Sequence, residues 1–565
     1  MTSITILANT AVDTVDAIEA SKHYQGKELN CSIDGEISYI ETDHDHIFVV
    51  GYIQDNAFNQ AADRKAYFSK TEILNSVTQL NGHFSIVQVS KSDSSFTLYS
   101  NKAGGNRLYL KQTSNGWSIS NKLASLKANG DRLNPTALEE EFLYRWITGE
   151  HSLISGVYQV PSGHYWTIKA DSITQKHCYY TLPSVEDYQL NNGSLAELTQ
   201  ETKRLIISAL NKMLAPGKKI AILLSGGVDS SILAALAQHA GHQLVAISHR
   251  SIEHENPELA TAIKFAETLN IEHRVIDISD NEIADAFKQC ALITEQAPRF
   301  QSSIILYLLF EKLQNEFSQV IYGEAADTLF GNNSLKRYLK RQQKQQKVQK
   351  LTKWLPGSKY LISRLASKSK IQKLLSDTVE DYIQETNKLA INEYTLECLK
   401  KSISLNNHNY SLQQLNSYPQ HADALTNDLL KIKRFALDTD VDNHFHETGA
   451  LAAHFGLELV SPFVDIDVMN FAAHLPIEQT ITGEFVKPIL RQIGEQFFAP
   501  ELMYLAKKGF PAPHLTWLNT GLKKYVEQAV DDFIFVPAEQ LDTETCWTIA
   551  ALNILFTEFN IKYND

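Results

Sequence analysis

The segment "AILLSGGVDSSILAAL", residues 221–236, restricts the possible folds more than any other stretch of the chain. It begins as an apolar run, passes through Ser-Gly-Gly-Val-Asp-Ser, and continues as an alanine- and leucine-rich segment without a helix breaker. This order predicts a buried strand, a tight turn and a helix. The unpaired N–H groups of such a turn and of the first helical turn point at one spot, and the helix dipole makes that spot partly positive. The segment therefore predicts an anion-binding loop.

The residue types in this turn indicate a phosphate group held together with a metal ion. Gly226 and Gly227 let an anion approach the backbone closely. Three hydroxyl groups can add donors, those of Ser225, Ser230 and Ser231. The turn is not a G-x-x-x-x-G-K-S/T loop, because no lysine follows the glycines and Asp229 stands there instead. An acid beside a phosphate requires a cation between them, and Mg²⁺ bound by one or two carboxylates plus phosphate oxygens is the usual solution.

The rest of the chain predicts an α/β protein of two domains, because 565 residues exceed what one hydrophobic core holds. From about residue 195, strand segments such as "KIAILL", "QLVAIS", "HRVIDI" and "QVIYG" alternate with helical patterns, which predicts a parallel sheet covered on both faces. After Phe330 the pattern is mostly helical. Residues 1–190 contain short runs rich in β-branched and aromatic residues, with one expected helix at 134–149. The polar segment 182–194 is the expected linker to a second domain, 195–565.

Composition argues against several classes of protein. The chain carries a net charge of −13, which disfavours general nucleic-acid binding. No apolar stretch is long enough to cross a membrane and no basic leader opens the chain, so we expect a cytoplasmic protein. The five cysteines are scattered, without a C-x-x-C pair that would indicate zinc. The basic run at 336–373 predicts either an exposed, solvated helix or a docking face for an acidic partner.

Five motifs in order resemble those of the asparagine synthetase and β-lactam synthetase family, which cleaves ATP between its α- and β-phosphates. "LSGGVDSS" resembles the family's pyrophosphate loop, and "VIYGEAADTLFGN", 320–332, is similar to G-E-G-x-D-E-L-F-G-G. "FGLELVSPFVD", 455–465, resembles G-L-E-x-R-x-P-F-L-D. "VKPILRQI", 486–493, resembles K-x-x-L-R, and "AKKGFPAP", 506–513, resembles K-x-G-F-x-x-P.

The resemblance implies a fold and a reaction. The expected fold is an N-terminal Ntn-type αββα sandwich over 1–190, followed by a Rossmann-like synthetase domain of the adenine-nucleotide α-hydrolase type with a helical C-terminal part. The implied reaction is attack of a substrate carboxylate on the α-phosphorus of ATP, which releases pyrophosphate and leaves an acyl-adenylate. Ammonia or an amine then attacks the acyl group and expels AMP. ATP and Mg²⁺ are the expected cofactors, and a small-molecule or peptide carboxylate is the expected partner, with a homodimer left open.

The resemblance also implies roles for single residues at the phosphates. Asp229 and Asp327 would hold Mg²⁺, and Gly323 would contact the nucleotide. Lys487 would stabilise the charge that develops on the adenylate, or else is an exposed helix lysine. Lys508 would assist at the phosphates, with its neighbour in "AKKGF", position 507, as an equal candidate.

Other residues are candidates for the second substrate. Glu324 would take a proton from the attacking amine, or else caps the turn after its strand. Glu295 and Arg299 are candidate substrate contacts, since a guanidinium suits carboxylate recognition, with a structural role as the alternative. His249 could flank the adenine, although a histidine at a strand end is more often structural.

The sequence departs from the family pattern in both halves. Residues 1–190 resemble the glutamine-hydrolysing domain of asparagine synthetase, but position 2 is Thr2 where the family has its nucleophilic cysteine, and Asn101 replaces an acid. We therefore expect a glutaminase-like domain without activity. In the synthetase half, three substitutions alter the charge near the substrate and put aspartate as the substrate in doubt; they are Ala325, Thr328 and Val460.

Several functions stay open at this point. The amine could be free ammonia, an amine of the same molecule, as in the cyclases that make β-lactams or lasso peptides, or an amine of a second substrate. A non-catalytic scaffold on the same fold is an alternative of a different class. A nucleic-acid-modifying enzyme with the same loop is disfavoured by the acidic charge balance.

Overall fold

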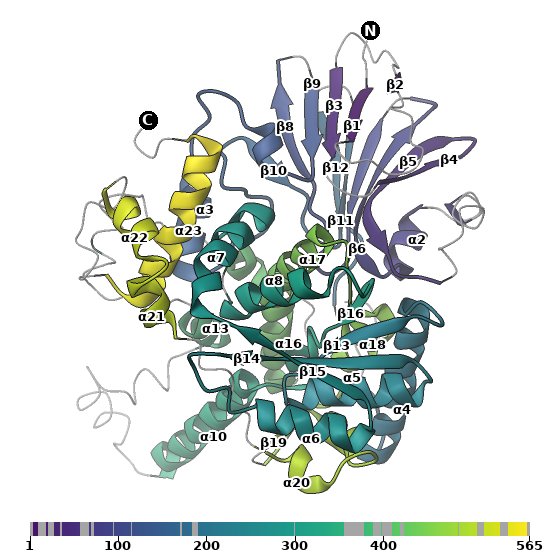
Figure 1. The fold of residues 1–565 in the computed structure, drawn as a ribbon, viewed down its shortest axis with the longest axis vertical. Helices are drawn as coiled ribbons and strands as arrows, with labels where there is room; N and C mark the ends of the chain where they lie inside the picture. Colours follow the sequence, from purple (N-terminus) through teal and green to yellow (C-terminus); the bar gives the residue numbers. More distant parts are fainter. Residues whose placement is uncertain are drawn as a thin grey trace.

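The computed structural model of the chain is shown in Figure 1. It describes residues 4–8, 19–20, 28–33, 37–56, 67–68, 73–93, 95–114, 116–169, 172–182, 190–298, 300–354, 378–387, 397, 410–417, 423–483, 485–505, 513–531 and 541–561. Two packed sheets lie at the upper right of the view, and a third sheet with its covering helices fills the lower half.

The N-terminal part contains two six-stranded sheets. The first has the order β10-β8-β9-β3-β1-β2, with bounds Val157–Gln159, Tyr109–Thr113, Gly116–Ser120, Glu28–Ile33, Ile4–Ala8 and Glu19–Ala20. The second has the order β12-β11-β7-β6-β5-β4, with bounds Ser172–Cys178, His164–Lys169, Phe96–Ser100, Gly82–Ser90, Asp45–Ile53 and Ile37–Glu41. Buried apolar side chains of both sheets form one cluster, which includes Val50, Leu98, Leu110 and Ile119.

The alternation of apolar residues in these strands explains the packing, since successive side chains of a strand point to opposite faces. One face of the second sheet meets the first sheet, and its other face packs against helix α2, Ile73–Gln79. The helix predicted at 134–149 is present as α3, Pro135–Tyr144, which begins where the Asn134 side chain accepts the N–H of Thr136. Its predicted end at Gly149 is wrong, because the backbone turns left-handed at Arg145. The sandwich of sheets agrees with expectation, and its assignment as an Ntn-type αββα fold stays a prediction.

The second half of the chain is built on a five-stranded parallel sheet with the order β15-β14-β13-β16-β17. The strands are Glu272–Ile278, Gln243–Ser251, Lys219–Leu223, Gln319–Ile321 and Glu458–Val460. The first four are the predicted strands, so the predicted α/β class with a parallel sheet is confirmed. Strands β14 and β15 follow β13 on one side, whereas the next strand, β16, lies on the other side of β13. Ligands of such sheets bind at the carboxyl ends of the strands, beside this switch point.

Helices cover both faces of this sheet, namely α4 Leu195–Met213, α5 Val228–His239, α6 Leu259–Leu269, α7 Asp280–Thr294, α8 Gln301–Leu313 and α9 Ala326–Phe330. Two of these helices begin at a capping motif that the local sequence specifies. Ser194 with Glu197 forms a capping box at α4, and Ser279 with Glu282 forms one at α7.

The remainder is mainly helical, as predicted from the pattern after Phe330. It comprises α10 Asn333–Trp354, α13 Val379–Asn387, α15 Tyr410–Gln413, α16 Ala424–Ala436, α17 Asp442–His454, α18 Ile466–Ala473, α19 Pro488–Gly494, α20 Pro500–Met503, α21 His514–Asn519, α22 Lys523–Ala529 and α23 Thr543–Phe559, with a short hairpin of β18 Ile481–Thr482 and β19 Phe485–Val486. The basic run lies on α10 up to Trp354, and residues 355–373 of it lie outside the described ranges. None of the described helices has both the length and the apolarity that a membrane crossing needs.

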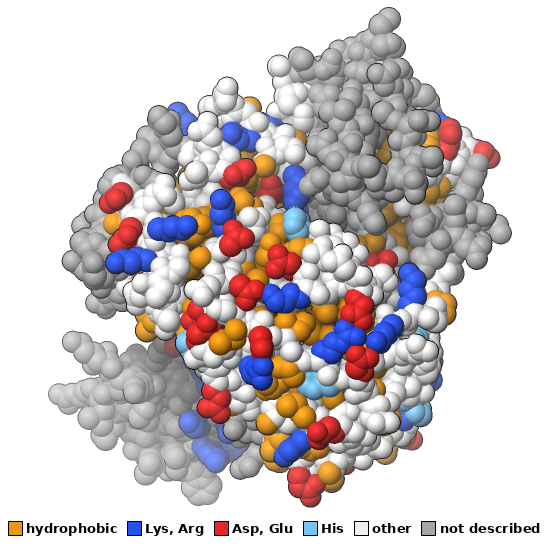
Figure 2. All heavy atoms as spheres, in the orientation of Figure 1, with side chains coloured by type: hydrophobic (Ala, Val, Ile, Leu, Met, Phe, Trp, Pro, Cys, Tyr) orange, Lys and Arg blue, Asp and Glu red, His pale blue; other side chains and the backbone are white. Residues whose placement is uncertain are grey.

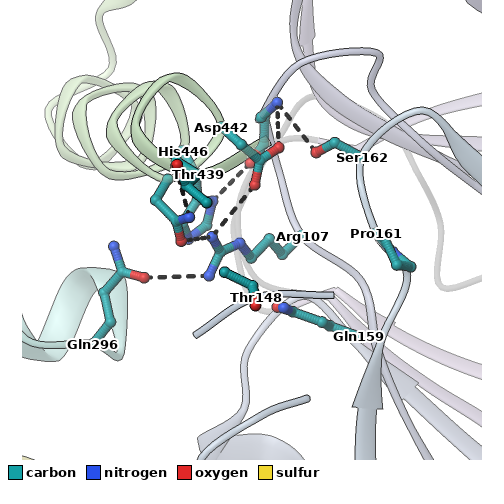
Figure 3. Close-up of polar contacts among 12 residues, drawn as sticks. Arg107, Thr148, Gln159, Pro161, Ser162, Gln296, Thr439, Asp442 and His446 are labelled. Atoms are coloured by element: carbon teal, nitrogen blue, oxygen red, sulfur yellow. Dashed lines mark hydrogen bonds and ion pairs between the residues drawn. The ribbon is translucent and has the colours of Figure 1, made fainter. Parts of the chain in front are cut away.

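The two halves share buried contacts. The Gln54 side chain donates to the carbonyl of Leu459 at 3.0 Å, and the N–H of Leu459 donates to the hydroxyl of Tyr52 at 2.9 Å. Figure 3 shows a second junction, where Arg107 donates to Gln296 at 3.2 Å and lies beside Asp442. The largest apolar cluster also runs through both halves. The part of the chain built on the parallel sheet is therefore packed against the N-terminal sandwich.

On the face seen in Figure 2, acidic and basic side chains are interspersed. Ion pairs join such charges on β15, where Arg274 lies 2.6 Å from Glu272 and 2.5 Å from Glu316. The described side chains on this face form no broad region of one sign.

Candidate active site

The predicted anion-binding loop lies between β13 and α5, at the switch point of the parallel sheet. Gly226 has φ of 83°, in the left-handed region, and a Cβ added there would lie 2.5 Å from the carbonyl oxygen of Glu258. Only glycine fits this position without strain. Gly227 precedes the first helical turn, and no side chain caps that turn. The N–H groups at the start of α5 are therefore available to an anion.

The hydroxyl side chains of the loop divide into two groups. Ser225 and Ser230 line a cavity in front of the loop, and their hydroxyl oxygens lie 3.2 Å apart. Ser231 is fully buried, and its hydroxyl donates to the carbonyl of Val228 at 2.9 Å. The structure thus brings Ser225 and Ser230 to the cavity and holds Ser231 inside the helix packing.

Asp229, Asp327 and Lys487 meet at the mouth of this loop. The Lys487 ammonium lies 2.8 and 2.6 Å from the two carboxylate oxygens of Asp229, and 2.6 Å from a carboxylate oxygen of Asp327. Asp229 is on the first turn of α5 and Asp327 is on α9, just beyond β16, so the two acids come from neighbouring strands as predicted. The Lys487 side chain is 5% exposed, which contradicts the alternative of an exposed helix lysine.

Lys487 itself has φ of 60°, and it precedes α19, whose first residue is Pro488. A lysine in the left-handed region is uncommon and costs conformational energy. The surrounding hairpin and helix therefore impose this backbone geometry, which directs the ammonium to the two acids.

A cavity of about 590 Å³ opens in front of the sheet's carboxyl edge. Its lining includes Ser225 and Asp229 from one strand end and Gly323, Glu324 and Asp327 from the next. Apolar side chains of α8, such as Ile305 and Leu309, form another wall beside Ile247 and His249. A cavity with apolar walls and a few convergent polar groups is typical of a small-molecule site.

Glu324 forms a buried pair with a residue that the sequence did not indicate. A carboxylate oxygen of Glu324 lies 2.5 Å from Nδ1 of His444, on α17. Burial opposes protonation of His444, but the carboxylates of Glu324, Glu447 and Asp440 together outweigh burial and raise the pKa of the imidazole. Both side chains line the cavity, where the pair can hold and release a proton.

The three residues that depart from the family pattern lie in different environments. Ala325 has φ of 69°, which suits the glycine that the family carries there. Thr328 lines the cavity, whereas Val460 is fully buried in β17. Ala325 lines the cavity as well, so two of the three substituted residues, Ala325 and Thr328, are placed to contact a ligand.

Glu295 lies at the junction of the two halves. Its carboxylate accepts the N–H groups of Leu123 and Ala124, at 2.6 and 2.8 Å, and its backbone is left-handed with φ of 53°. Glu295 is not among the residues that line the cavity. This placement does not support a substrate contact, because both carboxylate oxygens are used to hold a turn of the N-terminal sandwich.

Four predicted residues lie outside the described ranges, namely Thr2, Arg299, Lys507 and Lys508. Asn101, which replaces an acid, is buried and donates to the carbonyl of Gly82 at 2.6 Å. The expectation of an inactive glutaminase-like domain therefore stays a prediction.

The donor set fits magnesium held with a nucleotide. Within the described residues, no group of three or more His, Cys, Asp or Glu side chains is arranged to hold a metal alone. Mg²⁺ usually takes one or two carboxylates and completes its shell with phosphate oxygens and water, and Asp229 and Asp327 offer such a pair. The Lys487 ammonium between them shows that this position already accommodates a cation.

Comparison with known proteins places the site in a family. A family model described as asparagine synthase matches residues 201–554. A putative glutamine-hydrolysing asparagine synthetase of Mycobacterium bovis is 21% identical over 410 residues, which are 71% of this chain and 61% of that protein. Glutamine-hydrolysing asparagine synthetase 1 of Bacillus subtilis is 20% identical over 414 residues, 72% of this chain and 63% of that protein.

The match thus spans about three fifths of the length of these relatives. Among solved structures, an NMN synthetase from Francisella tularensis is 24% identical with a TM-score of 0.19, covering 25% of this chain and 58% of that one. The family model, by contrast, spans more than half of the chain and includes the loop, both acids, Glu324 and Lys487. The chain belongs to the asparagine synthase family.

Proposed function

We propose that the chain is an ATP-dependent ligase that joins a carboxylate to ammonia or an amine and releases AMP and pyrophosphate. One observation carries the proposal: Asp229, Asp327 and Lys487 converge beside an uncapped helix N-terminus at the switch point of a parallel sheet. Positive charge at that point can neutralise the phosphates of a nucleotide whose base lies in the adjoining cavity.

In the first step, an oxygen of the substrate carboxylate bonds to the α-phosphorus, and the bond from that phosphorus to the pyrophosphate oxygen breaks. Negative charge builds on the departing pyrophosphate and on the α-phosphate oxygens. Lys487 and the N–H groups of α5 would stabilise this charge. Asp229 and Asp327 would hold Mg²⁺, which when bound neutralises phosphate charge.

In the second step, ammonia or an amine attacks the activated acyl carbon, and AMP leaves with the shared oxygen. The attacking nitrogen must lose a proton. The Glu324–His444 pair would accept it, because both groups line the cavity and the pair can hold one additional proton. Whether the amine is free ammonia or part of a larger molecule depends on the rest of the substrate pocket.

The proposal is tested by exchange of labelled pyrophosphate into ATP, with a panel of carboxylates and no amine. We expect exchange with some members of the panel and none in Asp229→Asn. Exchange that persists in Asp229→Asn would contradict the assignment of the phosphate site. A protein that is a scaffold would give no exchange with any carboxylate and no binding of ATP.

A further inference from the structure

A second cavity of about 320 Å³ adjoins the first and has a different character. Four residues line both cavities, namely Phe300, Thr328, Asn332 and Asp440. We call the second cavity the cationic chamber and define it by Arg145, Arg337 and Lys433, which line it together with the shared residues. Because the walls are shared, a ligand in the first cavity can extend into the chamber.

The charges of the two cavities are opposite. Apart from two histidines, the titratable side chains that line the first cavity are acidic: Asp229, Glu258, Glu324, Asp327 and Asp440. The chamber is lined by three cationic side chains against the single shared carboxylate of Asp440, which accepts the indole N–H of Trp146 at 2.8 Å. Among the described lining residues, cations therefore outnumber carboxylates in the chamber, whereas carboxylates predominate in the first cavity.

Lys433 is the chamber residue that most directly indicates a ligand. It lies on α16 with 8% of its surface exposed, and no described residue forms an ion pair or a side-chain hydrogen bond with it. Burial lowers the pKa of its ammonium to about 8. An ammonium that is buried without a partner is costly, so proteins seldom keep one without a reason.

The neighbouring Lys431 shows what a purely structural lysine looks like on the same helix. It is equally buried at 8%, but its ammonium lies 2.6 Å from Glu380. Lys431 lines neither cavity. Two residues apart on α16, one lysine pairs with a carboxylate of the fold, whereas the other lines a chamber whose one described carboxylate, that of Asp440, accepts the indole N–H of Trp146.

Arg145 adds a second cation in an unusual backbone geometry. It ends α3 with φ of 74°, in the left-handed region that non-glycine residues seldom occupy. Strained residues of this kind concentrate where a side chain must be aimed. The rest of the chamber wall is mixed, with apolar side chains such as Leu335 and Phe435 beside hydroxyl side chains such as Ser334 and Thr386.

We propose that the cationic chamber binds a carboxylate or phosphate group of a substrate, separate from the group that reacts in the first cavity. The inference rests on the function proposed above for the first cavity. It specifies the class of substrate, which is a molecule larger than one amino acid that carries a second anionic group. The anion would take the ammonium of Lys433 as its partner. The molecule concerned is either the acid that is activated or the amine that attacks.

Direct binding tests the chamber without any turnover. Glutarate and inorganic phosphate are titrated by calorimetry into the full chain, into Lys433→Met and into Lys431→Met. We expect Lys433→Met to bind about tenfold more weakly than the unaltered chain, as for loss of one charge-assisted hydrogen bond. Lys431→Met should bind as the unaltered chain does, which separates loss of a ligand from loss of packing. Equal affinities of the unaltered chain and Lys433→Met overturn the inference.

Turnover then identifies which substrate carries the anion. AMP formation is compared for dicarboxylates against monocarboxylates of equal length, and for ω-amino acids against alkylamines of equal length. The preferred series should be the one with the second anion, and Lys433→Met should reduce that preference about tenfold while Lys433→Arg retains most of it. A preference that is unchanged in Lys433→Met overturns the inference. If no pair of substrates gives AMP but Lys433→Met still binds the anions more weakly than the unaltered chain, the proposed function is wrong and the inferred anion site in the chamber is retained.

Discussion

Replacement of Lys487 by methionine tests the electrostatic centre of the site. Methionine keeps the approximate length of the side chain and removes its charge, which leaves Asp229 and Asp327 facing each other without a cation. The ammonium makes three contacts of 2.6–2.8 Å with the two carboxylates. Its loss therefore affects both the resting fold and the charge available to the phosphates.

The expected size of the loss in stability follows from how deeply the two carboxylates are buried. Breaking a buried ion pair costs about 3–5 kcal/mol, but the Asp327 side chain is 53% exposed and water can solvate it again. We expect Lys487→Met to lower the free energy of unfolding by about 2–4 kcal/mol in the absence of Mg²⁺, mainly through Asp229, whose side chain is 18% exposed. Turnover should fall by about a hundred- to a thousandfold, the usual effect of removing one group that stabilises transition-state charge. ATP affinity should change much less.

Lys212 offers a matched control. Its ammonium also bridges two aspartates, Asp465 at 3.0 Å and Asp467 at 3.6 Å, of which one is buried and one is exposed. It lines neither cavity. Lys212→Met should lose thermal stability and keep its turnover.

Thermal unfolding with and without Mg²⁺, together with steady-state kinetics, distinguishes the two variants. Added Mg²⁺ should stabilise Lys487→Met more than it stabilises the unaltered chain or Lys212→Met, because the metal can replace the missing ammonium between the acids. If Lys487→Met loses only ATP affinity, or if Mg²⁺ stabilises all three proteins equally, the reasoning is wrong.

Three further predictions concern the same site. Asp229→Asn and Asp327→Asn should each abolish pyrophosphate release while circular dichroism shows an unchanged fold; release at the normal rate in either one would remove that residue from the phosphate site. Gly226→Ala should weaken ATP binding by at least about tenfold, since a left-handed alanine costs about 1–2 kcal/mol and the carbonyl 2.5 Å from its Cβ must also move. Burial opposes protonation of His444 but Glu324 raises its pKa above the ordinary 6.5, so below that raised pKa the pair already holds its proton. The acidic limb of kcat/KM should therefore lie above pH 6.5 and move to lower pH in His444→Gln; a limb that does not move would exclude the pair as proton acceptor.

Local sequence predicted those parts of the site that local structure determines. The strand, the turn at Gly226 and the start of α5 follow one another within a dozen residues, and each is specified by its own composition. Asp327 was placed beside Asp229 by the rule that parallel strands end in a common crevice. The three-residue strand β17 was missed because so short an apolar run cannot be separated from a loop by its pattern.

Contacts between segments that are far apart in the chain could not be predicted from the sequence. His444 reaches Glu324 across 120 positions, and nothing near either residue signals the pair. Glu295 was expected at the substrate, but tertiary packing turns its carboxylate to backbone amides 171 and 172 residues away. The Lys433 environment likewise arises where α3, α10, α13 and α16 come together around one space.

The central claim is that a substrate carboxylate displaces pyrophosphate at the α-phosphorus of ATP. The most direct measurement uses a carboxylate labelled with heavy oxygen, taken from the panel that supports pyrophosphate exchange, and mass spectrometry of the nucleotide product after amide formation. The account predicts AMP that carries one labelled oxygen and pyrophosphate that carries none. ADP as the product, or label in released phosphate rather than in AMP, would contradict it.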